Sequence, residues 1–137
     1  VARRGGDADH ARSAFGRGVA EAVFWTPASV LPGPGVRWEA VDNATARVII
    51  THGSLTQAVD LTVAENGAPT QVVFQRWSDA NPHKTYQLQP FGGFLSDFRQ
   101  VQGFCVPCHV EAGNMFGTDG YFPFYIVDLV DMQFPDA

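Results

Sequence analysis

The segment QAVDLTVAENGAPTQVVFQRW, residues 57–77, decides the fold of this chain. Its first half alternates apolar with polar or small residues, which is the period-2 pattern of a half-buried strand. The pair Asn66 and Gly67 follows, and this dipeptide favours the tight turn of a β-hairpin. The second half is rich in β-branched and aromatic residues, which are typical of strands. The segment therefore predicts an antiparallel hairpin with strands over 57–64 and 70–77.

Similar patterns continue on both sides of this hairpin. Short extended segments alternate with turn-rich sequence such as SDANPH at 78–83. Short connections between successive strands predict a meandering antiparallel sheet. We expect about eight strands, over residues 36–41, 45–51, 57–64, 70–77, 84–89, 94–102, 104–113 and 122–134.

One helical pattern precedes the sheet, over residues 9–24. Ala11, Phe15, Val19 and Val23 recur at the spacing of one helix face. Pro27 ends the pattern, because the residue before a proline disfavours the helical conformation. The sequence thus predicts an α+β, mainly antiparallel β fold: a curved meandering sheet, or half-barrel, with one N-terminal amphipathic helix. We expect a flexible segment over 1–8 and a single domain over 9–137.

Composition limits the possible functions. The chain has 137 residues, of which 45% are hydrophobic, 12% aromatic and 17% charged, with a formal net charge of −5. A chain of this size and apolar content can bury one core, and it does not have the composition of a disordered protein. A mildly acidic chain without a basic run is not expected to bind nucleic acid. No apolar run is long enough for a membrane helix, no secretory signal is visible, and the sequence does not assign a compartment.

The predicted sheet has more apolar surface than its helix can cover. A helix of about four turns is only ~10–12 Å wide and cannot cover eight strands. The rest of the apolar face must meet a ligand, a second sheet or another chain. Ligand pockets are predominantly aromatic and aliphatic, so we expect a hydrophobic or lipid-like ligand on the concave face. The candidate lining residues are Trp25, Trp38, Phe74, Phe94 and Tyr125, with Arg76 or Arg99 meeting the polar head of the ligand.

Two alternatives stay open, and no cofactor is predicted by any of the three interpretations. In the first, the same cavity serves a small-molecule enzyme, with Asp128 or Asp97 as acid–base, because carboxylates beside apolar cavities often have that role. Asp128 interrupts the apolar side of the last predicted strand, and its ordinary alternative is an ion pair with an arginine or an outward position at a bulge. In the second, the chain is a structural or assembly subunit whose exposed sheet face docks on a partner protein or on its own copy.

The string Cys105-Val106-Pro107-Cys108-His109 matches the pattern of a covalent haem attachment site. Its flanks alternate like a strand, however, and residues three apart in a strand point to opposite faces. A haem edge or a disulfide would need both thiols on one side. We therefore expect two structural cysteines and no metal site, with Cys105, Cys108 and His109 as the candidate haem or metal ligands. A zinc site would need a fourth ligand, from His52, His83 or Glu111.

Three segments resemble a known family: AEAVFWTP at 20–27 with VRWEAV at 36–41, GFLSDFRQVQG at 93–103 with Val106 and Pro107, and FPFY at 122–125. Together they are similar to the C-terminal half of a bacterial family known only as a domain of unknown function. The resemblance implies a fragment or a short member of that family. It also implies a half-barrel like that of periplasmic lipoprotein carriers, whose concave face is hydrophobic. The family supplies no catalytic residues to carry over.

Overall fold

The hairpin expected over 57–77 is formed by β3 (Leu55–Val63) and β4 (Pro69–Ser78). The computed structural model describes residues 6–136. In this part of the chain, one α-helix and a short 3-10 helix precede seven strands. The other elements are α1 (Ala8–Trp25), η1 (Pro27–Val30), β1 (Val36–Ala40), β2 (Thr45–His52), β5 (Gln87–Val101), β6 (Phe104–Asn114) and β7 (Phe122–Asp128). The flexible segment predicted over 1–8 falls mostly outside the described residues, and the helix begins at its last residue.

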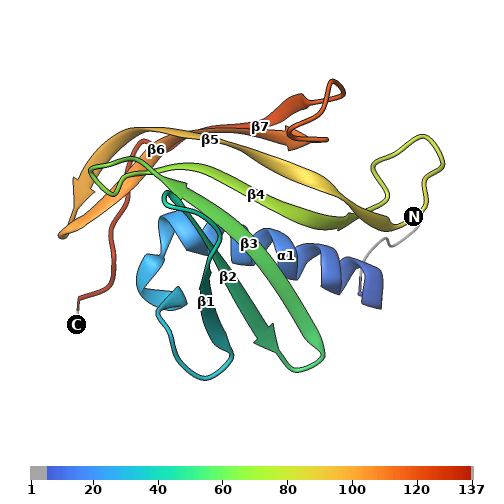
Figure 1. Cartoon of the computed structure of the whole chain (residues 1–137), viewed down its shortest axis with the longest axis horizontal. Helices are drawn as coiled ribbons and strands as arrows, with labels where there is room; N and C mark the ends of the chain where they lie inside the picture. Colours follow the sequence, from blue (N-terminus) through green and yellow to red (C-terminus); the bar gives the residue numbers. More distant parts are fainter. Residues whose placement is uncertain (1–5, 137) are drawn as a thin grey trace.

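All seven strands form a single antiparallel sheet in sequence order, from β1 at one edge to β7 at the other. Figure 1 shows this open sheet curving around α1, with β1, β2 and β3 on one side of the helix and the later strands above it. The inner face carries a row of paired residues across five strands: Trp38, Val48, Val59, Phe74 and Phe91. The predicted α+β class, with one helix on a curved meandering sheet, is confirmed.

The sheet has seven strands rather than eight, because β5 runs without a break through Pro90, Gly92 and Gly93. We expected these residues to separate two strands. Instead, the two glycines lie where neighbouring backbones come close, since a Cβ on Gly92 would lie 2.5 Å from the Val72 carbonyl oxygen and one on Gly93 would overlap the Glu111 carbonyl. A glycine within a strand often marks such a close approach of another backbone.

The last strand is shorter than expected and ends at Asp128. Tyr125 pairs with Ala112 but Pro123 pairs with Gly113, so Phe124 is the extra residue of a β-bulge. Phe122 and Ile126 lie on the outer surface, at 69% and 59% exposure. Tyr125 and Val127 point inward and pack against the core, and the bulge also brings Phe124 to the inner side of the sheet.

The helix begins at an Asp7 cap, whose carboxylate accepts a hydrogen bond from the backbone N–H of His10 at 2.9 Å. It packs mainly on β3 and β4, and its buried residues include Val19, Val23 and Phe24. Because β5, β6 and β7 extend past the helix, part of their inner face lacks a helical cover.

Candidate functional site

A cavity of about 100 Å³ lies between α1 and the inner face of β4–β7. We call it the helix–sheet cavity. Its walls are mostly apolar. Its polar side chains are Arg17 and Glu21 of α1, Arg76 of β4 and Tyr125 of β7. The lining residues are Arg17, Ala20, Glu21, Phe24, Val72, Phe74, Arg76, Phe91, Val110, Ala112, Phe124 and Tyr125.

Three of the seven predicted ligand-binding residues meet in this cavity: Phe74, Arg76 and Tyr125. Phe74 and Arg76 are alternate residues of β4, so they share its inner face. Tyr125 reaches the same space from the far edge of the sheet. The structure brings together side chains from strands that lie three places apart in the sheet order.

The other four predicted residues lie elsewhere. The indole of Trp25 donates a hydrogen bond to the Pro107 carbonyl at 3.1 Å, and that of Trp38 donates to the Val30 carbonyl at 2.8 Å. Trp38 lines a separate apolar depression beside η1. Phe94 is 51% exposed on the outer face, where it packs on Phe116 with ring centres 5.3 Å apart. Arg99 forms an ion pair with Asp97 at 2.7 Å.

Nine of the twelve lining residues were not predicted, among them four that contribute charged or aromatic groups: Arg17, Glu21, Phe91 and Phe124. A helical-wheel analysis could have found the first two, because Arg17 and Glu21 lie on the same helix face as Ala20 and Phe24. Phe91 lies in β5 between the two strands predicted over 84–89 and 94–102. Phe124 turns inward through the bulge, and its ring meets that of Phe91 edge to face at 6.0 Å.

A chain of polar contacts closes one side of the cavity. Arg17 pairs with Glu21 at 3.2 Å, and the Tyr125 hydroxyl donates a hydrogen bond to Glu21 at 3.2 Å. Burial and the nearby Glu21 carboxylate raise the pKa of Tyr125 above its ordinary value. The tyrosine therefore stays neutral and acts as a donor at physiological pH.

Arg76 supplies the other polar group of the cavity. Its guanidinium carbon lies 5.1 Å from the centre of the Phe91 ring, and its buried Nε has no hydrogen-bond partner among residues 6–136. Burial, followed by the nearby Arg17 charge, lowers its pKa. Buried donors are normally satisfied in native proteins, so this unpartnered Nε distinguishes the cavity.

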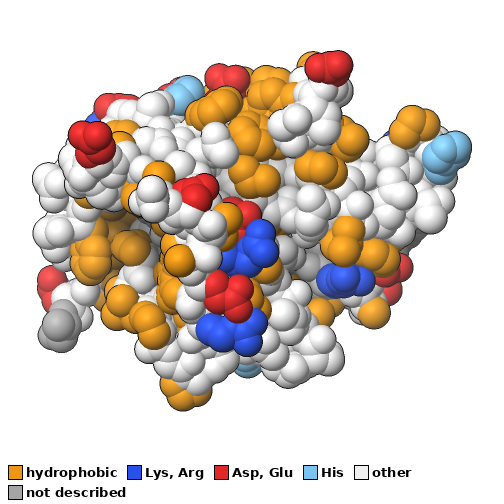
Figure 2. All heavy atoms as spheres, in the orientation of Figure 1, with side chains coloured by type: hydrophobic (Ala, Val, Ile, Leu, Met, Phe, Trp, Pro, Cys, Tyr) orange, Lys and Arg blue, Asp and Glu red, His pale blue; other side chains and the backbone are white. Residues whose placement is uncertain are grey.

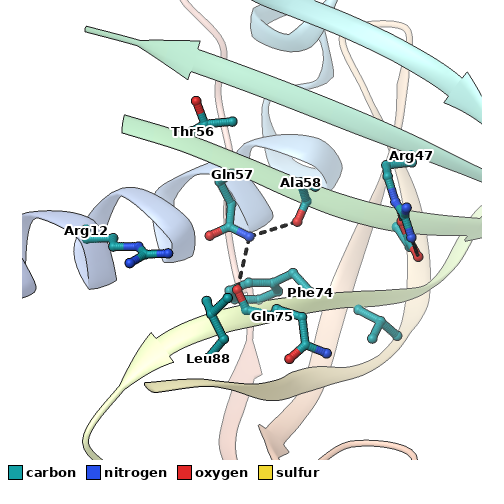
Figure 3. A pocket seen from close by; sticks show the side chains of 10 residues that line it. Arg12, Arg47, Thr56, Gln57, Ala58, Phe74, Gln75 and Leu88 are labelled. Carbon is teal, nitrogen blue, oxygen red and sulfur yellow. Dashed lines mark hydrogen bonds and ion pairs between the residues drawn. The ribbon is translucent and has the colours of Figure 1, made fainter. Parts of the chain in front are cut away.

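A larger pocket of about 430 Å³ opens where β3 and β4 separate. Their pairing runs from Val59 opposite Phe74 to Val63 opposite Pro69 and is absent beyond Val59. Figure 3 shows the Gln57 amide bridging this gap by donating to the carbonyls of Ala58 and Gln75, at 2.8 and 3.2 Å. Arg47 on the wall is already bound by Asp60. These polar groups are already paired, unlike the Nε of Arg76.

Neither predicted acid–base carboxylate lines the helix–sheet cavity. Asp128 is 77% exposed and binds Nδ1 of His109 at 2.6 Å. Ser96, His109 and Asp128 pair in one row across β5, β6 and β7. Within residues 6–136 no hydrogen bond joins Ser96 to His109, so the row is not an assembled catalytic triad. Asp97 lies near the far end of β5 with Arg99.

The two cysteines of the haem-like string lie in β6, with Cys105 exposed and Cys108 buried, and both are free thiols. The predicted separation of the two thiols by strand alternation is confirmed. In residues 6–136 no group of three or more His, Cys, Asp or Glu side chains is placed to hold a metal ion. No helix in the same range is long and apolar enough to cross a membrane.

Hydrophobic side chains also gather at the surface over β5 and β7 (Figure 2). Exposed hydrophobic residues of these two strands include Phe122, Ile126 and Phe94. Glu111 lies between Phe94 and Ile126 in the strand register. This outer patch is on the opposite face of the sheet from the helix–sheet cavity.

Comparison with known proteins assigns a family but no activity. No curated protein and no solved structure matches the chain. A family model described as a family of unknown function, DUF6544, matches residues 1–126. The chain belongs to this family of unknown function.

Proposed function

We propose that this protein binds a hydrophobic, lipid-like ligand whose apolar end enters the helix–sheet cavity. The observation that carries the proposal is an apolar space next to the core that no side chain of α1 fills. Phe74, Val110 and Ala112 form part of its wall and are buried. Cavities lined by such side chains stay dry and take up apolar guests.

The size of the cavity limits what it can enclose. A volume of about 100 Å³ is the room of about three water molecules, at ~30 Å³ each. Sites that enclose a drug-sized molecule have ~300–1,000 Å³. The cavity would therefore receive the end of a chain or a single ring, and the rest of the ligand would lie along its exposed rim.

The rim of the cavity combines an exposed aromatic ring with an exposed cation. Phe124 is 50% exposed there, and the Arg17 side chain is 59% exposed. An apolar ring and a cation side by side suit a molecule with an apolar chain and a polar end. The lipid-binding half-barrel implied by the family resemblance has the same chemistry on its concave face.

An NMR titration tests the proposal. The probe is 1-octanol, added to ¹⁵N-labelled protein below its solubility limit. We expect saturable shifts of backbone amides around Ala20, Val110 and Ala112. The variant Ala20→Leu fills the cavity from the helix and should abolish these shifts. The matched control is Ala14→Leu, the same change at an exposed position of the same helix.

Two results would overturn the proposal. One is the absence of saturable shifts in the wild-type protein at the solubility limit of octanol. The other is unchanged binding to a folded Ala20→Leu variant, because a ligand outside the cavity would not sense this substitution.

A further inference from the structure

The head group of the ligand can be inferred from Arg76. This residue lies on the inner face of β4 and lines the helix–sheet cavity beside Phe74 and Phe91. Its Nε is buried and has no hydrogen-bond partner in the part of the chain that the structure describes. Within residues 6–136 no carboxylate forms an ion pair with its guanidinium.

The nearest charges do not neutralise Arg76. Glu21 attracts it, but that carboxylate already pairs with Arg17 and accepts the Tyr125 hydroxyl. Burial lowers the pKa of Arg76, and the second positive charge that Arg17 adds to the same cavity lowers it further. A partly buried cation without a counter-ion is costly, and an incoming anion would offset that cost.

The guanidinium is also oriented by its neighbour. Its carbon lies 5.1 Å from the centre of the Phe91 ring, within the range of a cation–π contact. The ring supports the apolar face of the guanidinium and cannot satisfy its in-plane N–H groups. Those groups form a planar fork that matches the two oxygens of a carboxylate or phosphate.

We propose that the ligand is a single-chain acidic amphiphile, with its oxyanion head group on Arg76, the end of its chain in the apolar part of the helix–sheet cavity and the rest of the chain along the rim. This inference rests on the proposed function, since it assigns the polar end of the same ligand. Phe91 and Phe124 would contact the first methylene groups of the chain. The ion pair between Arg17 and Glu21 would border the head group without binding it.

Probes of equal chain length test the head group. We would titrate the wild-type protein with octanoate, octyl phosphate, 1-octanol and octylammonium at neutral pH, below micelle-forming concentrations. The better of the two anions should bind at least about ten-fold more tightly than octanol, which is the effect of one hydrogen bond between charged groups. Octylammonium should bind more weakly than octanol. The comparison of octanoate with octyl phosphate then identifies the preferred oxyanion.

Substitution of the arginine gives the second arm. Arg76→Met retains much of the apolar length of the side chain and removes its charge. The affinity for both anions should therefore fall to that for octanol, while the affinity for octanol stays unchanged. Arg37→Met is the control, because Arg37 is exposed and pairs only with Glu39. Arg76→Lys keeps the charge but lacks the planar fork of N–H groups, so it should lose part of the preference for anions over octanol. This variant replaces Arg76→Met in the test if Arg76→Met does not fold.

The outcomes separate the two proposals. Equal affinities for octanol and both anions in the wild type would overturn the acidic head group and leave the apolar site standing. A preference that survives in folded Arg76→Met would also overturn it. If none of the four probes shifts the cavity amides, the proposed function itself fails.

Discussion

The hydroxyl of Tyr125 donates a hydrogen bond to Glu21 across 104 residues of sequence, at an O–O distance of 3.2 Å. This contact joins the edge strand β7 to the helix at the boundary of the helix–sheet cavity. Within residues 6–136 it is the only hydrogen bond or ion pair between α1 and β7.

Removal of this hydroxyl should have a modest and measurable cost. In Tyr125→Phe the ring still packs against the core, and Glu21 keeps its ion pair with Arg17. A typical hydrogen bond contributes about 0.5–1.5 kcal/mol to stability, and we expect the free energy of unfolding to fall within that range. Urea denaturation monitored by circular dichroism measures it. A value of zero would mean that the bond is not maintained in solution.

The same tyrosine should give the protein an alkaline sensitivity. Burial and the Glu21 charge raise the pKa of Tyr125 in the folded state, while the unfolded chain keeps a pKa of ~10. Its contribution to stability is complete below pH ~10 and is lost as the pH rises through the folded pKa, because the unfolded state then releases its proton first.

Denaturation series between pH 8 and pH 11.5 test this sensitivity. The decline in stability should be shallower in Tyr125→Phe than in the wild type. Tyr121 is a useful comparison, because burial and Glu111 raise its pKa as well. In the double variant Tyr121→Phe with Tyr125→Phe, stability should therefore decline with pH still less steeply. Identical slopes in all three proteins would contradict the assignment.

Periodicity predicted most of the fold but only part of the cavity. Alternation shows which residues of one strand share a face, and it correctly placed Phe74 with Arg76. It does not show how far the helix extends over the sheet, so it could not separate Tyr125, which lines the cavity, from Trp25, whose indole binds the Pro107 carbonyl. Nor could it anticipate a bulge that turns Phe124 inward.

The prediction from local sequence was wrong in β5, where neighbouring backbones lie very close together. Pro90, Gly92 and Gly93 have the composition of a turn, and the sequence does not distinguish a turn from a strand in which neighbouring backbones nearly touch. That error hid Phe91, the residue that supports Arg76. The unpartnered Nε of Arg76 is likewise a property of the assembled packing, and no pattern in β4 reveals it.

Two glycines of α1 should respond in opposite ways to the same change. A Cβ at Gly18 would meet nothing within 4 Å, so Gly18→Ala should raise the free energy of unfolding by about 0.5–1 kcal/mol through helix propensity. A Cβ at Gly16 would lie 2.6 Å from Oε1 of Gln57. Gly16→Ala should therefore displace that side chain and lose its bonds to Ala58 and Gln75, cancelling or reversing the gain. Equal stabilisation by both variants in urea denaturation would show that Gln57 does not bridge β3 and β4.

The cysteines should differ in reactivity. Cys105 is exposed and Cys108 is buried, and access limits the reaction of a thiol with a bulky reagent. We expect an excess of N-ethylmaleimide to label one cysteine rapidly in the native protein and both in 6 M guanidinium chloride. Peptide mass mapping should place the native label on Cys105, and Cys105→Ser should abolish the rapid phase. Rapid labelling of both thiols in the folded state would contradict the placement of Cys108.

The two faces of the sheet should tolerate substitution very differently. Phe122 is 69% exposed on the outer patch whereas Phe74 is 4% exposed in the core. Phe122→Ser should change the free energy of unfolding by less than about 0.5 kcal/mol, and Phe74→Ala should lower it by about 3–5 kcal/mol. Light scattering on the same samples adds a second readout, because an outer patch that mediates self-association would give Phe122→Ser a lower mass than the wild type at high concentration. A large loss of stability in a monomeric Phe122→Ser variant would instead mean that this ring is buried in solution, and that the inner and outer faces of β7 have been assigned the wrong way round.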